Sequence, residues 1–314
     1  MKPDLSVNIA GIRMKNPVMP ASGCFGYGEE MAQFFDLSLL GAIVTKGTTL
    51  ESREGNDPPR MIETRAGIIN FIGLQNPGVE VVIREKMPFL RRFEAPVIVN
   101  IAGKTIDDYA NLAWWFEKAR GVFRPDALEI NISCPNVKKG GMAFGQDPDV
   151  AAELVACVRK MTSITLIVKL TPNVTDIVAV AKAVVQAGVN ALSLINTLKA
   201  RAKIRSGEFA SKWVVGGLSG PAIKPVALQK IFEVSQANLG VPLIGMGGIQ
   251  FLEDVLDFFE AGSDAVAVGT ANFINPLVMP ELISQLEKYM AEKGYAFIAD
   301  LKQVKVSAPT RKGE

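Results

Sequence analysis

The stretch TLIVKLTPNVTDIVAVAKAVVQAGVNALSLINT (165–197) decides the fold of this 314-residue chain. It opens on an apolar run, continues into an amphipathic pattern that starts near Asp176 and ends at Gly188, and closes on a second apolar run. Runs that are apolar on both faces are typical of strands covered on both sides, and Asp and Gly commonly mark the two ends of a helix. The stretch therefore predicts strand, helix and strand in series.

The same alternation continues along the chain from Pro17 onward. Strand-like runs are expected at eight places: 17–23, 42–49, 96–103, 127–134, 165–173, 191–197, 241–248 and 265–273. Eight parallel strands with helices between them predict an α/β fold, a (β/α)₈ TIM barrel, and an open doubly wound sheet is the structural alternative.

The remaining segments predict which elements are added to the barrel. We expect one domain over residues 1–314, with a hairpin-like lead at about 1–16. Two stretches interrupt the repeat, at 51–74 and at about 198–220, and we expect them to form insertions at the C-terminal face of the strands, the second one acting as a lid.

Composition excludes several classes of protein. A net charge of +2, from 34 Lys+Arg and 32 Asp+Glu, argues against a nucleic-acid-coating protein. With no histidine, acid–base chemistry must come from Cys, Lys, Tyr or a carboxylate, and no metal site is expected. Three cysteines are one short of an ordinary iron–sulfur cluster, and their odd, sparse count is typical of a reducing compartment. No membrane span or secretion signal is expected, so we predict a cytoplasmic protein.

The carboxyl ends of the expected strands carry amides, lysines, hydroxyls and one thiol, and barrel enzymes place their chemistry at these ends. Such a set suits a ligand with amide edges and negative charge. The residues are Ser22, Lys46, Asn100, Asn131, Cys134, Lys169, Asn196 and Thr197. The last two strands end in glycine-rich turns, at 245–248 and 269–270, which predict a phosphate site, although the glycines could merely permit tight turns.

Three groups of residues have both a functional and a structural interpretation. Cys134 precedes Pro135 in a loop, where a thiolate near Lys46 or Lys169 could act as a base or nucleophile, whereas a lone cysteine is usually inert. Cys24 and Cys157 are interpreted as structural. The basic residues of the second insertion form either a solvated face or an anion-attracting lid; they are Lys199, Arg201, Lys203 and Arg205.

Several motifs carry a resemblance that spans nearly the whole chain. They are PASGCFGYG (20–28), NFIGLQNPG (70–78), EINISCPNVKKGG (129–141), LINT (194–197), GGLSGPAIKP (216–225), IGMGGI (244–249) and AVGTANF (267–273). With them the sequence resembles the class 1 dihydroorotate dehydrogenases, FMN-containing barrels, and specifically the NAD-linked class 1B catalytic subunits.

The resemblance implies oxidation of (S)-dihydroorotate to orotate in pyrimidine (UMP) biosynthesis, with one FMN per chain and Cys134 as the base. The residues implied for FMN are Ser22, Lys46, Gly47, Asn100, Asn131, Lys169, Ile195 and Gly220, with Gly247, Gly248, Gly269 and Thr270 around its phosphate. Those implied for substrate are Lys46, Asn70, Phe71, Ile72, Gly73, Leu74, Asn131, Asn196 and Thr197, and Asn136 is a weaker candidate.

The resemblance also implies a partner subunit with FAD and a [2Fe–2S] cluster, which passes electrons to NAD within a heterotetramer built on a dimer of barrels. Two features depart from the pattern of the subclass, Phe71 and the loop at 199–213, and could alter specificity. The functional alternatives are a dihydropyrimidine dehydrogenase-like barrel, a dihydrouridine synthase-like barrel acting on tRNA, and a non-enzymatic barrel that binds a phosphorylated ligand.

Overall fold

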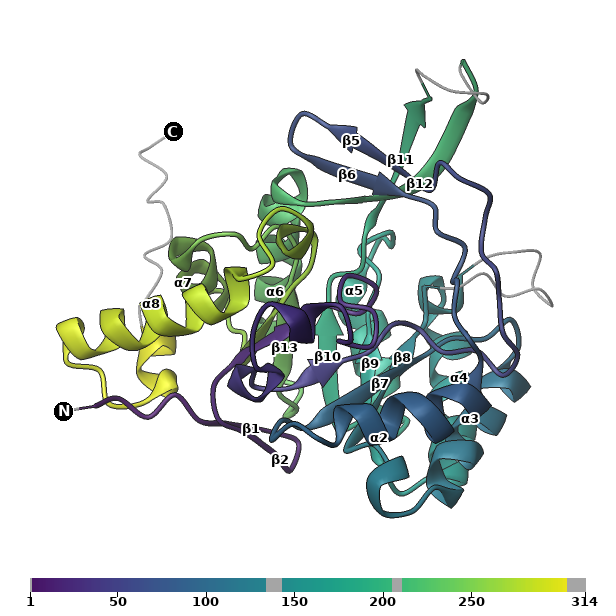
Figure 1. The fold of residues 1–314 in the computed structure, drawn as a ribbon, viewed down its shortest axis with the longest axis horizontal. Helices are drawn as coiled ribbons and strands as arrows, with labels where there is room; N and C mark the ends of the chain where they lie inside the picture. The colour runs from purple at the N-terminus through teal and green to yellow at the C-terminus, as the bar shows by residue number, and fades with distance from the viewer. Residues whose placement is uncertain (1, 134–142, 205–210, 304–314) are drawn as a thin grey trace, which may run out of the picture.

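Eight parallel strands form the central sheet of the computed structural model, which describes residues 2–133, 143–204 and 211–303 (Figure 1). Their order in the sheet is β3-β14-β13-β10-β9-β8-β7-β4. In chain order they are β3 (Val18–Pro20), β4 (Ile43–Val44), β7 (Val97–Ile101), β8 (Ala127–Asn131), β9 (Thr165–Lys169), β10 (Ala191–Leu194), β13 (Leu243–Met246) and β14 (Ala265–Val268). Each lies within one of the eight runs expected from the sequence.

The first and last strands of this sheet, β3 and β4, meet at a seam. There the Gly41 N–H donates to the Val18 carbonyl over 2.9 Å, which brings the two edges together. A Cβ at Gly41 would lie 2.0 Å from the Asn16 carbonyl oxygen, so the approach at the seam requires glycine. The sheet is therefore nearly closed, which confirms the predicted (β/α)₈ barrel and excludes the open doubly wound alternative.

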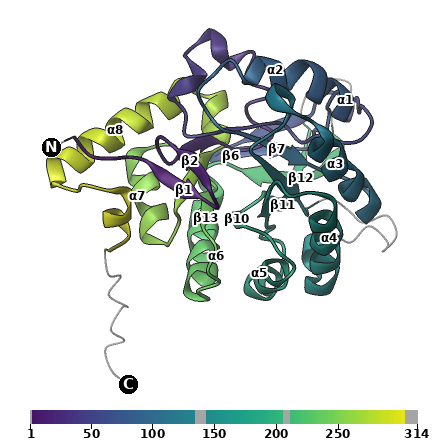
Figure 2. The ribbon, with the colours of Figure 1, turned by 90° about the horizontal axis from the view of Figure 1, so that it is seen from below.

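Helices surround the barrel, as Figure 2 shows from below. They are α1 (Val79–Val81), which continues through a π-helical turn (Val82–Lys86) into α2 (Met87–Leu90), then α3 (Ile106–Lys118), α4 (Pro148–Met161), α5 (Ile177–Gln186), α6 (Lys224–Gln236), α7 (Leu252–Glu260) and α8 (Val278–Lys293). The caps follow the sequence: the Asp147 and Asp176 side chains accept hydrogen bonds from the first-turn backbones of α4 and α5. Within the described residues, no helix is long and apolar enough to cross a membrane.

Strand residues alternate between two apolar cores. In β8, Leu128 and Ile130 pack outward against the helices, whereas Ala127 belongs to the barrel interior. The hairpin of β1 (Val7–Ile9) and β2 (Ile12–Met14) contributes side chains to the same interior and so plugs its amino-terminal end. Inward-facing polar side chains are therefore placed at the carboxyl end of the barrel.

The two insertions pair with each other. They supply β5 (Met61–Thr64), β6 (Gly67–Asn70), β11 (Leu198–Lys203) and β12 (Trp213–Ser219). These form an antiparallel sheet in the order β11-β12-β6-β5, which projects from the barrel in Figure 1. The register pairs Asn70 with Gly217, so the sequence-predicted lid is one half of a joint sheet.

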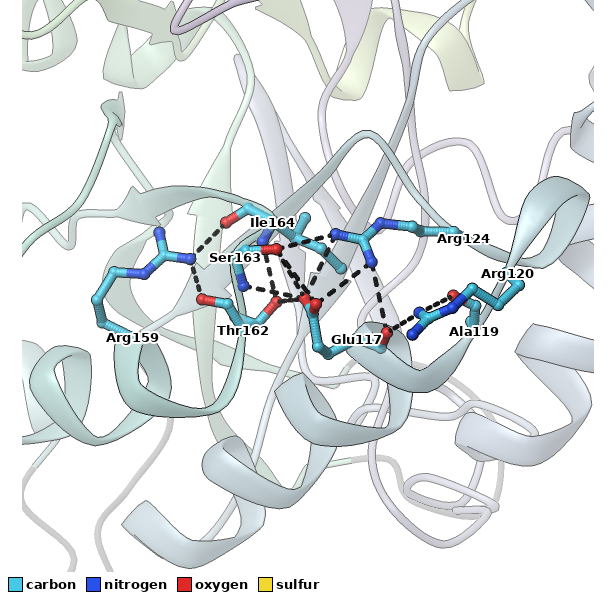
Figure 3. Close-up of polar contacts among 8 residues, drawn as sticks. All are labelled: Glu117, Ala119, Arg120, Arg124, Arg159, Thr162, Ser163 and Ile164. Atoms are coloured by element: carbon cyan, nitrogen blue, oxygen red, sulfur yellow. Dashed lines mark hydrogen bonds and ion pairs between the residues drawn. The ribbon is translucent and has the colours of Figure 1, made fainter.

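A polar cluster holds the carboxyl ends of α3 and α4 together near the amino end of β9 (Figure 3). The Glu117 carboxylate accepts from Thr162 Oγ1 at 2.7 Å and from the Ser163 N–H at 2.9 Å, and Arg124 lies 3.4 Å away. Arg159 donates to the Ile164 carbonyl at 2.9 Å. Burial alone would raise the pKa of Glu117, but these hydrogen bonds and the Arg124 charge outweigh it and lower the pKa to about 2.

We predict that Glu117→Gln destabilises the protein at pH 7 by roughly 1–2 kcal/mol, because the amide cannot accept from all of these donors. A carboxyl whose pKa is lowered on folding stabilises above its ordinary value of 4.5, and this stabilisation is lost as the pH falls toward about 2. Urea unfolding of both proteins should therefore show a gap at pH 7 that narrows below 4.5. Glu292→Gln, in an exposed 3.9 Å pair with Lys288, is the control and should change little. Equal stability of Glu117→Gln and wild type at pH 7 would contradict the prediction.

Candidate active site

A polar layer crosses the barrel at the carboxyl ends of β7, β8, β9 and β10. The sequence-predicted Asn100 and Lys169 lie here, only 1% and 5% exposed. Two further members, Glu129 and Ser193, are also buried and were not predicted. The signal for Glu129 was present in the sequence, because it stands two residues before Asn131 on the same strand and so faces the same side.

The described contacts tie three members of this layer together. Asn100 Nδ2 donates to Glu129 Oε2 over 2.7 Å, and Ser193 Oγ donates to Glu129 Oε1 over 2.7 Å. Asn100 Oδ1 is buried and has no hydrogen-bond partner among the residues that the structure describes. It lies 3.0 Å from the position that a Cβ at Gly47 would occupy, so Gly47 leaves room in front of it. An acceptor held in this way is suited to a ligand N–H or hydroxyl.

Three turns converge beside this layer: those after β12, β13 and β14. A Cβ at Gly248 (φ +84°) would lie 3.0 Å from the Gly220 carbonyl oxygen, and one at Gly220 would lie 3.5 Å from Thr270 Cγ2. Thr270 Oγ1 donates to Ser219 Oγ over 2.8 Å. The backbone N–H groups of Gly247, Gly248 and Thr270 donate to no other described residue. Free N–H groups in a glycine cradle suit a phosphate.

Two further segments implied for the cofactor lie beside this cradle: Ile195 and the loop that carries Ser22. Ile195 is buried and donates its N–H to the Met246 carbonyl over 3.0 Å. Gly269 opens onto the loop after β3 that carries Ser22, since a Cβ there would lie 3.6 Å from Ala21 Cβ and from Cys24 Sγ.

A second row of amides runs from β8 to the inserted sheet. Asn196 Nδ2 donates to Asn131 Oδ1 at 3.2 Å and to Ser133 Oγ at 2.9 Å. A Cβ at Gly217 would lie 2.1 Å from Thr197 Oγ1, so a glycine is required where β12 crosses Thr197. Asn70 Nδ2 donates to the Gly217 carbonyl at 3.1 Å. Four sequence-predicted residues therefore form one continuous row: Asn131, Asn196, Thr197 and Asn70.

Residues 71–74 approach the layer from the first insertion. Leu74 (φ 58°) lies near Gly47, with Cδ2 3.5 Å from the position of a Cβ there. Asn56, which the sequence analysis did not single out, supports this segment: its side chain donates to the Phe71 carbonyl at 2.5 Å and its N–H to the Ile72 carbonyl at 2.9 Å. A Cβ at Gly73 would meet the same asparagine.

Lys46 supplies a half-buried cation beside these residues. Burial lowers its pKa, and the Arg60 charge acts in the same direction, while Glu30 opposes them. A desolvated ammonium beside a second cation favours binding of an anion.

The cysteines divide between described and undescribed parts of the chain. Cys134 and Asn136 lie outside the described residues, as does Arg205. Burial raises the pKa of Cys24 to about 11 against the opposing charge of Lys169, so this thiol stays protonated at neutral pH. Among the described residues, no His, Cys, Asp or Glu side chains cluster to hold a metal ion.

Comparison with known proteins decides the family. Residues 4–290 match the family model described as dihydroorotate dehydrogenase. The chain belongs to the dihydroorotate dehydrogenase family. Proteins of Anoxybacillus flavithermus and Geobacillus kaustophilus are each 53% identical to it over 297 residues, covering 94% of both chains. One from Geotalea daltonii is 51% identical over 304 residues, covering 96% of this chain and 97% of its own.

All three relatives carry the name dihydroorotate dehydrogenase B (NAD(+)), catalytic subunit. The match confirms the resemblance drawn from the motifs and does not favour the dihydropyrimidine, tRNA or non-enzymatic alternatives. A dihydroorotate dehydrogenase of this class is an FMN-dependent oxidoreductase. The described site fits that cofactor in two respects: the glycine cradle offers free N–H groups to a phosphate, and the unpartnered Asn100 Oδ1 offers an acceptor.

Proposed function

We propose that this chain oxidises (S)-dihydroorotate to orotate, the ring-desaturating step of UMP biosynthesis. The observation that carries the proposal is that glycine turns with free N–H groups and a set of amides and lysines lie at the carboxyl ends of the strands of one dihydroorotate dehydrogenase barrel. The substrate has one carboxylate and an imide edge, which lysines and carboxamides recognise.

The cradle residues Gly220, Gly247, Gly248, Gly269 and Thr270 would hold the FMN phosphate, and Asn100 and Lys169 of the polar layer would contact its ring. The ring contacts we propose are Ser22, Lys46, Gly47, Asn100, Asn131, Lys169 and Ile195. When bound, FMN supplies the acceptor for the hydride from C6 of the substrate. Lys169, buried and without an ion pair to any described residue, would stabilise negative charge on the ring.

The row of amides would orient the substrate. We assign this to Asn70, Asn131, Asn196 and Thr197, with Lys46 as the cation for the carboxylate and residues 71–74 as one wall. Because Asn196 Nδ2 is shared between Asn131 and Ser133, the row is ordered before substrate binds, which reduces the entropy lost on binding. Cys134 would take the proton from C5 as its base.

The function is tested by mixing the purified flavoprotein with dihydroorotate in the absence of oxygen. The visible flavin absorbance should bleach, and dihydrouracil, which lacks the carboxylate, should leave it unchanged. Bleaching by dihydrouracil instead would show that the chain is a dihydropyrimidine dehydrogenase-like enzyme. A purified protein without flavin would overturn the proposal.

For the base, we predict that Cys134→Ala retains FMN and orotate but slows bleaching by dihydroorotate by roughly 10²–10⁴-fold, the usual loss for a general base. The rise of rate with pH that reports the thiol should disappear as well. Cys157→Ala, which removes a half-buried thiol on α4, is the matched control and should react like wild type. An unchanged rate and pH profile in Cys134→Ala would show that another group takes the proton.

We further propose that the electrons reach NAD through a partner subunit carrying FAD and a [2Fe–2S] cluster, in a cytoplasmic heterotetramer built on a dimer of barrels. The relatives are named catalytic subunits, which supports a partner. Three cysteines and no G-x-G-x-x-G run leave this chain without the usual means to hold a cluster or NAD. Next to the glycine turns, Phe251, Phe273 and Ile274 are 65%, 50% and 71% exposed, as is typical of subunit interfaces.

The partner proposal predicts that the isolated chain, although bleached by dihydroorotate, reduces NAD at a negligible rate. Co-expression with the FAD and iron–sulfur subunit should restore NAD reduction, measured by absorbance of NADH, and the two chains should copurify. Full NAD reduction by the isolated chain would eliminate the partner without affecting the proposed dehydrogenation.

A further inference from the structure

Glu129 is a carboxylate enclosed by the barrel that neither binds substrate nor transfers a proton in the function proposed above. We propose that Glu129 is a positioning residue, whose carboxylate holds the Asn100 carboxamide in the one orientation that presents Oδ1 to the flavin. The inference rests on the proposed function, since it takes the space in front of Asn100 as the flavin site.

The first argument is the chemistry of the contact. A carboxylate has acceptors and no donor, so the 2.7 Å contact with Glu129 Oε2 must use the amide nitrogen of Asn100. The amide oxygen is then directed away from Glu129. It is the atom that is buried without a partner among the described residues, beside Gly47. A neutral amide at position 129 would tolerate either orientation of Asn100, whereas a carboxylate tolerates one.

The second argument is the cost of the arrangement. Glu129 is 3% exposed and lies on β8 between the outward-facing Leu128 and Ile130. A buried carboxylate is unfavourable, and an apolar residue of similar volume would be easier to accommodate in a barrel interior. Within the described part of the chain, Glu129 makes no ion pair, and its only side-chain donors are Asn100 and Ser193. Its burial is therefore unexplained by stability and consistent with orienting a neighbour.

Ser193 makes it possible to distinguish a positioning role of Glu129 from a purely structural role, in which Glu129 only forms hydrogen bonds with buried donors. Ser193 donates to the other carboxylate oxygen over 2.7 Å and is itself fully buried, and among the described contacts no hydrogen bond joins it to Asn100. Removing its hydroxyl leaves the Asn100 contact intact. If Glu129 were merely structural, losing either donor would affect the protein alike; if it positions Asn100, only the Asn100 side of the network affects the flavin.

The test is a double-mutant cycle on FMN binding, measured by titrating apoprotein with FMN and following flavin fluorescence. Glu129→Ala and Asn100→Ala should each weaken FMN roughly tenfold, and the double variant should bind as Asn100→Ala does, within about twofold, because Glu129 acts through Asn100. Ser193→Ala should stay within about twofold of wild type. Additive losses in the double variant, or a Ser193→Ala loss equal to that of Glu129→Ala, would overturn the inference.

Glu129→Gln keeps the shape of the side chain and covers the case in which Glu129→Ala does not fold. It should weaken FMN several-fold when Asn100 is present and leave affinity unchanged in the Asn100→Ala background. If Glu129→Gln binds FMN as tightly as wild type does, while the wild-type protein is yellow and is bleached by dihydroorotate, the inference is wrong and the proposed function stands. A wild-type protein that binds no FMN would instead defeat the proposed function.

Discussion

Closure of the parallel sheet is the constraint on which the other features depend. When β3 and β4 meet at Gly41, every second residue of each strand is directed into one narrow interior. Most of that interior is filled by apolar side chains and plugged by the β1–β2 hairpin. Polar side chains can then be accommodated only in the last layer before the carboxyl ends, where a ligand can contact them. The position of the site is therefore set by the end of the apolar packing.

Pairing of the two insertions is the second determinant. Either insertion alone would be a long loop that leaves the barrel. Because β6 pairs with β12, the two insertions form one sheet that is anchored at both ends. The glycines at 216 and 217 allow this sheet to lie against Asn70 and Thr197. The proposed substrate side of the site is thus built from segments on different strands, and Asn56 supports it from outside.

Electrostatics in the polar layer are arranged around few charges. Lys169 and Glu129 are both buried, on neighbouring strands, yet neither is ion-paired with a described residue. Glu129 accepts from the neutral side chains of Asn100 and Ser193, and the proposed function assigns Lys169 to a ligand. A site of this kind suits an anionic, amide-edged molecule, because it offers preorganised dipoles and the cations Lys46 and Lys169, which agrees with the chemistry of a dihydroorotate dehydrogenase.

The sequence by itself determined the eight strands, the helices between them, the glycine turns and the amides and lysines at the strand ends, because these depend on local periodicity and on residue type. Through their motifs it also predicted that Asn70, Asn131, Asn196 and Thr197 belong to one site, and the structure places them in one row. Only the tertiary structure decided that Asn100, Glu129 and Ser193 form one network, that the two insertions share a sheet, and that the seam lies at Gly41. Those contacts join residues far apart in the chain, and strand register and barrel closure, which no local pattern encodes, bring them together.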